Sequence, residues 1–202
     1  MMVNSDRPPR EGTEIPLLRR PETYQHVKGL RAVRRFRNAA IPEEDIVAIL
    51  EAGRWTGSAK NRQAWAFVVM TDPEDRARLA EVGGPDGPLT RAAVSVALVR
   101  LPGGNDFDIG RAAQSMMLAA AALGIGSCAA TLHDQERAAE ILDLPADHVA
   151  QWSIGFGYPD DVAEAELRSA RRATIGSGRK PLDEVVHRGR FKCLRITGQP
   201  FS

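Results

Sequence analysis

The 202-residue chain has too few of certain residues to belong to several common classes of protein. It has only two cysteines, Cys128 and Cys193, and they lie too far apart for a zinc motif or a disulfide framework. We interpret both as small apolar residues in a reducing compartment. Aromatic residues make up 5% of the chain and the formal net charge is +1. These values argue against a base-stacking platform and a strongly basic nucleic-acid surface.

Long apolar runs are also missing. The longest, MMLAAAALGIG, is too short to span a bilayer. The N-terminal stretch MMVNSDRPPREGTEIP lacks the apolar core of a secretory signal. We therefore predict a cytoplasmic protein that binds neither a membrane nor nucleic acid.

The composition that remains is that of one ordinary folded domain with a tail at each end. Residues 1–22 are rich in Pro, Arg and Glu, and we expect a flexible tail there. We expect the folded domain over 23–188 and an extended C-terminal arm over 189–202. Hydrophobic periodicity predicts helices over 24–30, 41–55, 73–82, 106–123 and 134–142, and buried strands over 64–71, 92–100 and 149–157.

This order of elements favours an α+β or α/β layer architecture around one sheet. The helix over 106–123 carries a wide apolar face rich in alanine, and Gly124 stands where a left-handed cap residue belongs. The following GSCAAT is either a short strand or a turn, and the charged segment AEAELRSARR is either a loop or a surface helix.

One motif invites a wrong conclusion. GIGSCA, from Gly124 to Ala129, fits the dinucleotide pattern G-x-G-x-x-A. That fingerprint must follow a strand and open a helix, whereas here it follows a helix. Helix capping and a tight turn explain Gly124 and Gly126, and we reject a Rossmann site.

Three segments are rich in hydrogen-bond donors. SAKNRQAWAF places Lys60, Asn61, Arg62 and Gln63 directly before a strand, LRAVRRFR carries four arginines, and GSGRKP places two basic residues beside two glycines. Arginine forks and glycine-rich main chain suit phosphate oxygens. A single arginine cluster is more often a solvated face, but three such segments favour an anionic ligand with polar edges.

No set of side chains for acid–base or nucleophilic catalysis emerges. The four histidines show no metal-ligand spacing, and no G-x-S-x-G nucleophile motif is present. If the protein is an enzyme, we expect a cofactor to supply the difficult chemistry.

Taken together, LRAVRRFRNAAIPEEDIVAILEAGRWTGSAKNRQAWAFVV, DIGRAAQSMMLAAAALGIGSCAAT, FGYP and RKPLDEVVH resemble the FMN-dependent nitroreductase family over about residues 30–187. The resemblance implies an α+β fold with three α/β/α layers and a central mixed, mainly antiparallel sheet. It also implies an intertwined homodimer with FMN in the interface and NAD(P)H as co-substrate. The C-terminal arm would then pack on the partner subunit.

The resemblance also implies which residues bind the flavin. Arg31 would contact the phosphate, Ala32 would line the site, and Arg34 would sit near the N1–C2=O edge. Asn61 would bond the pyrimidine edge with Arg62 and Gln63 close by, while Trp65 and Phe67 would pack behind that loop. The remaining candidates are main-chain groups near N5 and a C-terminal phosphate cluster, namely Ala129, Ala130 and Thr131, and Ser177, Arg179 and Lys180.

The expected reaction is ping-pong hydride transfer from NAD(P)H through FMN to an electron-poor acceptor such as a nitroaromatic or a quinone. No protein side chain is expected to be catalytic, and no metal is expected. Two alternatives stay open. Some relatives use the flavin for oxidation, dehalogenation or flavin fragmentation. Alternatively the dimer would sequester flavin without turnover, since Leu30 and Ala32 replace the Arg and Ser common in the family.

Overall fold

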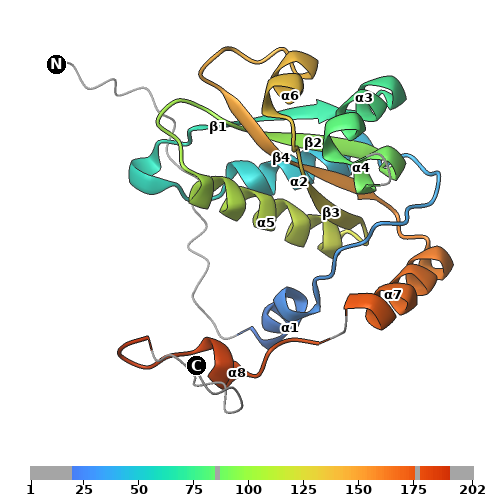
Figure 1. The fold of residues 1–202 in the computed structure, drawn as a ribbon, viewed down its shortest axis with the longest axis vertical. Helices are drawn as coiled ribbons and strands as arrows, with labels where there is room; N and C mark the ends of the chain where they lie inside the picture. The colour runs from blue at the N-terminus through green and yellow to red at the C-terminus, as the bar shows by residue number, and fades with distance from the viewer. Residues whose placement is uncertain (1–19, 85–86, 176–177, 192–202) are drawn as a thin grey trace, which may run out of the picture. The chain divides into compact units, whose positions relative to one another are not determined.

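The computed structural model describes residues 20–84, 87–175 and 178–191. Most of the expected N-terminal tail over 1–22 and of the expected C-terminal arm over 189–202 lies outside this part of the chain, although the first helix already begins at Pro21. The chain divides after Asp160 into two compact units. The first unit contains the sheet and most of the helices (Figure 1). Within the residues described for it, the second unit contains α7 (Asp161–Ile175) and α8 (Leu182–Val185).

The first unit alternates helices and strands along the chain. Its helices are α1 (Pro21–Gly29), α2 (Glu43–Arg54), the 3-10 turn η1 (Ala59–Asn61), α3 (Pro73–Gly83), α4 (Pro88–Arg91), α5 (Asp106–Ala122) and α6 (Gln135–Ile141). Its strands are β1 (Trp65–Met70), β2 (Val94–Arg100), β3 (Gly126–Thr131) and β4 (Val149–Gly157).

The four strands form one sheet in the order β1-β2-β4-β3, and every neighbouring pair is antiparallel. A parallel contact is added at one point, where Ala32 forms an isolated bridge with Ser127. The predicted α+β fold with a mainly antiparallel sheet is therefore confirmed.

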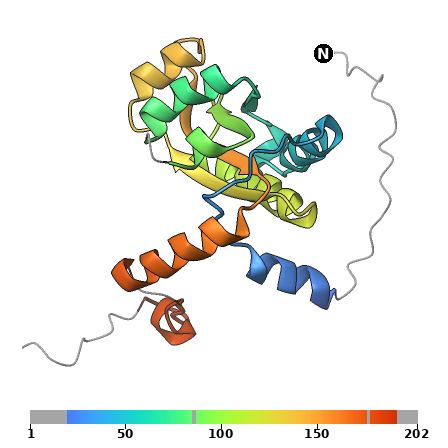
Figure 2. The same cartoon turned by 90° about the vertical axis from the view of Figure 1, so that its right-hand side faces the viewer.

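Helices cover both faces of this sheet (Figure 2). Alternate residues of β2 show the division: Val96 and Leu98 pack in one core with Ile49 and Met116 from α2 and α5. Ala97, by contrast, joins a second core that contains Leu79, Leu89 and Ala138 from α3, α4 and α6. Successive side chains of β2 thus point to opposite faces of the sheet and enter both cores, as expected for a sheet buried on both sides.

The central helix α5 begins and ends with conventional caps. The side chain of Asn105 accepts a hydrogen bond from the main chain of Asp108, and Gly124 follows the helix with a φ of 73°. The left-handed residue predicted at Gly124 is confirmed. The buried face of α5 includes Ile109, Met116 and Ala120, because apolar residues recur at helical spacing.

Two segments that the sequence left open are now assigned. GSCAAT is the edge strand β3, and AEAELRSARR lies inside α7. The sequence pattern predicts no helix between 82 and 92, but Pro88 begins the four-residue helix α4 there. In the described residues, no helix is long and apolar enough to cross a membrane.

Candidate functional site

The arginine-rich segment LRAVRRF lies against the start of β3. The N–H of Val33 donates to the carbonyl of Ser127 at 2.9 Å, and the N–H of Asp160 donates to the carbonyl of Arg35 at 3.0 Å. Phe36 bridges Pro159 after β4. The segment is therefore fixed between the ends of two strands that are far from it in sequence.

Two glycines make this close approach possible. A Cβ at Gly126 would lie 2.8 Å from Cβ of Val33, and a Cβ at Gly157 would lie 2.8 Å from Cγ of Phe36. Both distances are shorter than carbon atoms tolerate without displacement. Gly126 of GIGSCA thus has a packing role, because it lets the arginine-rich segment cross β3.

Beyond this crossing, β3 is the free edge of the sheet among the described residues. Leu132, directly after β3, donates its N–H to the carbonyl of Gln151 in β4, whereas the carbonyl of Ser127 faces the other way, toward Val33. Main-chain groups alternate along an antiparallel strand. Ala129 and Thr131 therefore direct their N–H and C=O groups outward, as Ser127 does.

The side chains of β3 divide in the same way. Ala129 and Thr131 are exposed, while Ala130 is buried in the core formed with α3, α4 and α6. Thr131 pairs with the half-buried Trp152 on β4. Ala129 and Thr131 thus offer main-chain donors at an open edge, and Ala130 contributes only its backbone.

The basic side chains of the segment lie at its surface. Arg31 is exposed and its Nη1 donates to the carbonyls of Lys28 and Leu30, both at 2.7 Å. Ala32 is exposed and Arg34 is half-buried. None of the carboxylates in the described residues forms an ion pair with Arg31. A guanidinium held by carbonyls and free of carboxylates keeps its charge available for an anion.

The donor-rich loop Lys60–Gln63 has an unusual backbone. Lys60, Asn61 and Gln63 have φ values of 54°, 52° and 50°. Such left-handed conformations are uncommon for residues other than glycine, and clusters of them occur at functional sites. The side chains of Asn61, Arg62 and Gln63 are exposed, and Nε2 of Gln63 donates to Oδ1 of Asn61 at 3.0 Å.

The first two turns of α5 hold the residues just before this loop in place. The buried Oδ2 of Asp108 accepts from the N–H of Ala59 at 3.0 Å, and Nη1 of Arg111 donates to the carbonyl of Gly57 at 2.6 Å. Behind the loop, Trp65 is buried and Phe67 packs against the same core. The packing role predicted for these two aromatic residues is confirmed.

The loop and the arginine-rich segment lie at opposite ends of α5 (Figure 1). The loop bonds to the first turn of α5, while the arginine-rich segment bonds to β3, which begins four residues after α5 ends. Seventeen residues of helix span roughly 25 Å at about 1.5 Å per residue. Asn61 and Arg31 of one chain are therefore not neighbours.

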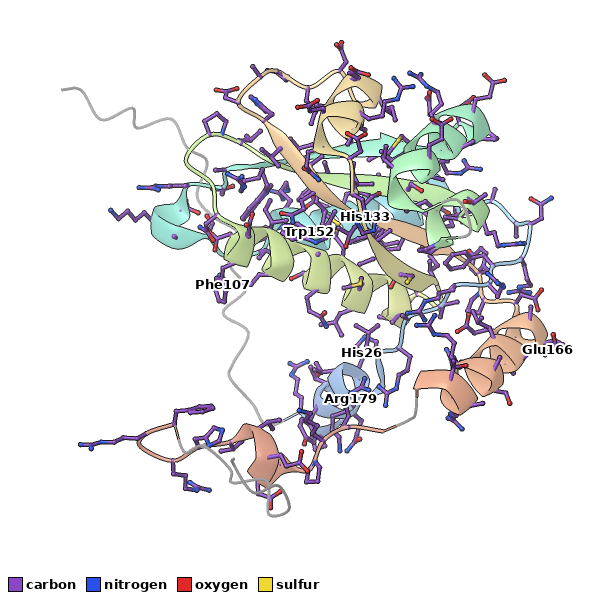
Figure 3. The ribbon with its side chains drawn as sticks, viewed as in Figure 1. His26, Phe107, His133, Trp152, Glu166 and Arg179 are labelled. Carbon is purple, nitrogen blue, oxygen red and sulfur yellow. The ribbon has the colours of Figure 1, made fainter. Side chains whose placement is uncertain are left out.

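The third predicted segment belongs to the second unit. Ser177 lies outside the described residues, and Arg179 and Lys180 are exposed. Nη1 of Arg179 donates to the carbonyl of Gly178 at 3.1 Å. Arg179 is labelled in Figure 3.

The sequence interpretation missed the residues that support the candidate site. Asp108 and Arg111 anchor the loop, and Gly126 and Gly157 admit the arginine-rich segment. An acid in the first turn of a helix is common, so Asp108 could be expected there, but such acids are rarely buried, so its buried anchoring role could not. The glycines had none, since the close contact joins residues far apart in the chain.

Comparison with known proteins agrees with this arrangement. A structure titled as an FMN-dependent nitroreductase from Clostridium difficile superposes with a TM-score of 0.62 at 26% identity, covering 67% of this chain and 86% of that one. A relative from Archaeoglobus fulgidus, provisionally named an NADH dehydrogenase/NAD(P)H nitroreductase, is 29% identical over 142 residues, or 65% of this chain and 82% of the relative.

A shorter match joins this chain to an iodotyrosine deiodinase from Haliscomenobacter hydrossis, at 37% identity over 68 residues, or 34% of this chain and 31% of the relative. The model of the Nitroreductase family matches residues 27–83 and 100–158. These two ranges contain the arginine-rich segment, the donor-rich loop, α5 and β3. The chain belongs to the Nitroreductase family.

Proposed function

We propose that this chain is an FMN-dependent oxidoreductase that takes a hydride from NAD(P)H and passes electrons to an electron-poor acceptor of the nitroaromatic or quinone type. One observation carries the proposal. An arginine-rich segment is fixed beside an open strand edge, so that cations and main-chain donors meet at one place. The names of the relatives support FMN and NAD(P)H.

The residues present suit an FMN molecule. Its phosphate needs a cation, and Arg31 is exposed and free of carboxylates within the described residues. Its ring needs main-chain donors at one edge, and the N–H groups of Ala129 and Thr131 face outward from β3. Its pyrimidine edge alternates donors and acceptors, and the amide of Asn61 offers both.

Bound FMN would supply the redox chemistry, accepting a hydride at N5 and passing electrons to the acceptor. The half-buried Arg34 would place a cation beside the flavin ring, where it would favour the negative charge of the reduced flavin, and a charge acts more strongly where water is partly excluded. The outward N–H groups of Ala129 and Thr131 would hold the edge of the flavin ring. We assign Arg62 and Gln63 to the pyrimidine edge and Ala32 to the wall of the site.

We assign the C-terminal cluster to the phosphate, with Arg179 as its principal cation and Ser177 and Lys180 beside it. Gly176 and Gly178 on either side of Ser177 suit an anion, because the main chain can approach closely there. The exchange Arg179→Gln should therefore weaken FMN retention, while Arg172→Gln on the exposed surface of α7 serves as the matched control.

We propose that the protein works as a homodimer. Arg31 and Asn61 lie at opposite ends of α5, so a site that uses both needs Asn61 from a second chain. A twofold axis would bring the first end of one α5 to the last end of the other, and cyclic dimers are the commonest assemblies. Large apolar side chains also remain exposed, with Trp55 at 69% and Phe107 at 75%. Phe107 lies at the end of α5 that holds the donor-rich loop (Figure 3).

The test starts from the purified protein and its absorbance spectrum. We expect a yellow protein whose flavin bands bleach when NADPH or NADH is added without oxygen and return when a quinone follows. A colourless protein that FMN cannot reconstitute would contradict the proposal. Sedimentation should give a dimer, and a monomer that retains FMN would exclude the shared site.

Dehalogenation is the second candidate function, because the deiodinase match reaches 37% identity, although over 68 residues only. Iodide release from an iodinated phenol by the reduced protein would favour it over simple reduction. The cytoplasmic location predicted from the sequence stays a prediction.

A further inference from the structure

A second polar pocket lies in the first unit, away from the residues proposed for FMN. Its volume is about 440 Å³, within the range of small-molecule sites. It opens where the segment after LRAVRRF passes the start of α3 and the short helix α4. Its lining residues are Phe36, Arg37, Asn38, Ala39, Ala40, Thr71, Arg76, Thr90, Arg91, Ala92 and Ala93.

Three arginines line this pocket, and they come from three different segments. Arg37 follows the arginine-rich segment, Arg76 lies in α3 and Arg91 ends α4. No ion pair joins any of the three to a carboxylate of the described residues, although Arg78 on the same helix as Arg76 pairs with Asp75. Three arginines without a salt bridge in the described residues thus converge on one cavity.

Arg76 is the most constrained of the three. Its Nη1 donates to the carbonyl of Thr71, and its Nε is buried without a hydrogen-bond partner in the described residues. Burial lowers the pKa of the Arg76 guanidinium, and the Asp72 carboxylate partly offsets this. A partly buried cation that a nearby carboxylate compensates only in part is unfavourable, and an anion bound in the pocket would relieve that cost.

Arg37 and Arg91 complete the positive wall from the exposed side. The guanidinium of Arg37 lies 5.7 Å from the ring centre of Tyr158, so a cation–π contact orients it. Thr71, Thr90 and Asn38 add hydroxyl and amide groups to the same wall. Planar arginine forks together with hydroxyls are the groups that bind phosphate oxygens in proteins.

We propose that this pocket binds a phosphate-bearing small molecule at a site separate from the flavin. None of the residues assigned to FMN lines it, so the two sites can be filled at once. A carboxylate ligand would use fewer of the donors, because a phosphoryl group offers three oxygens to three arginines.

The experiment uses the FMN-loaded protein, so that the flavin site is already occupied. Isothermal titration with inorganic phosphate, inorganic pyrophosphate and AMP, at constant ionic strength set with chloride, measures each Kd. The test variant is Arg37→Gln with Arg91→Gln, because both side chains are exposed and their loss should leave the fold intact. Arg78→Gln removes a charge from the same helix as Arg76 but outside the pocket.

We expect the wild-type protein to bind pyrophosphate, and the double variant to bind it more weakly by roughly tenfold or more. Arg78→Gln should keep the wild-type Kd, and all three proteins should keep the same FMN content. Tighter binding of AMP than of phosphate would identify a nucleotide as the occupant, and equal binding would identify the phosphoryl group as the part recognised. Absence of binding to the wild type, or an equal Kd in the double variant, would overturn the proposal.

Discussion

The contact between Gly126 and Val33 yields the sharpest prediction, because one methyl group tests how the arginine-rich segment is held. In Gly126→Ala the new Cβ would lie 2.8, 2.9 and 3.0 Å from Cβ, Cγ1 and Cγ2 of Val33. Carbon atoms in contact prefer about 3.5–4.0 Å, so the overlap is roughly 0.5–1 Å. A β-branched side chain has no flexible end that can move aside.

The strain can be relieved only by moving one main chain away from the other. Overpacking of this kind costs about 1–3 kcal/mol. If the segment moves, the hydrogen bond from Val33 to Ser127 at 2.9 Å is lost as well, at about 1 kcal/mol. We expect the free energy of unfolding to fall by about 1–4 kcal/mol, and FMN affinity to fall with it, because Arg31 and Arg34 move with the segment.

Urea unfolding and flavin fluorescence titration measure the two effects. Gly110→Ala is the matched control, since Gly110 lies in α5 and a Cβ there would meet nothing within 4 Å. The free energy of unfolding of Gly110→Ala should rise by about 0.5–1 kcal/mol, because alanine is the better helix former. Wild-type stability and FMN affinity in Gly126→Ala would refute the assigned role of this contact.

The remaining predictions concern the donor-rich loop and the core. Asn61→Ala should weaken FMN retention more than Lys60→Ala, and equal retention after gel filtration would remove Asn61 from the site. Asp108→Ala leaves the N–H of Ala59 without its acceptor. The free energy of unfolding, measured in urea, should therefore fall by about 1–3 kcal/mol. Gly53→Ala places a Cβ beside Cε of Met116, the movable end of a flexible side chain. Its free energy of unfolding should therefore fall by less than that of Gly126→Ala in urea. A larger fall would show that Met116 cannot move.

Much of the fold could be predicted from the sequence because its signals are local. The spacing in α5, the cap at Gly124 and the apolar run from Val149 to Gly157 depend on residues close together in the chain, and the structure confirms each. The short helix α4 escaped prediction, because four residues give no periodicity to detect.

The candidate site was less accessible, because its geometry depends on contacts between distant segments. No local pattern shows that Gly126 lies beneath Val33, or that Asp108 bonds to a loop 49 residues earlier. The donor chemistry of Arg31 and Asn61 could be identified, but their separation along α5 could not.

That separation changes how the three donor-rich segments should be understood. Taken along the sequence, they suggest one ligand held by one chain. In the fold, Asn61 and Arg31 are divided by the length of α5, and each is fixed by its own contacts at its own end. Such rigid anchoring leaves little freedom for the two ends to approach one another within a chain. A ligand that needs both groups must therefore lie between two copies, and in a twofold dimer it must be bound twice.

Mixing Arg31→Gln protein with Asn61→Ala protein tests this directly, because a shared site predicts heterodimers with one intact and one doubly damaged site. Such mixtures should recover part of the wild-type FMN content, whereas sites within single chains would recover none.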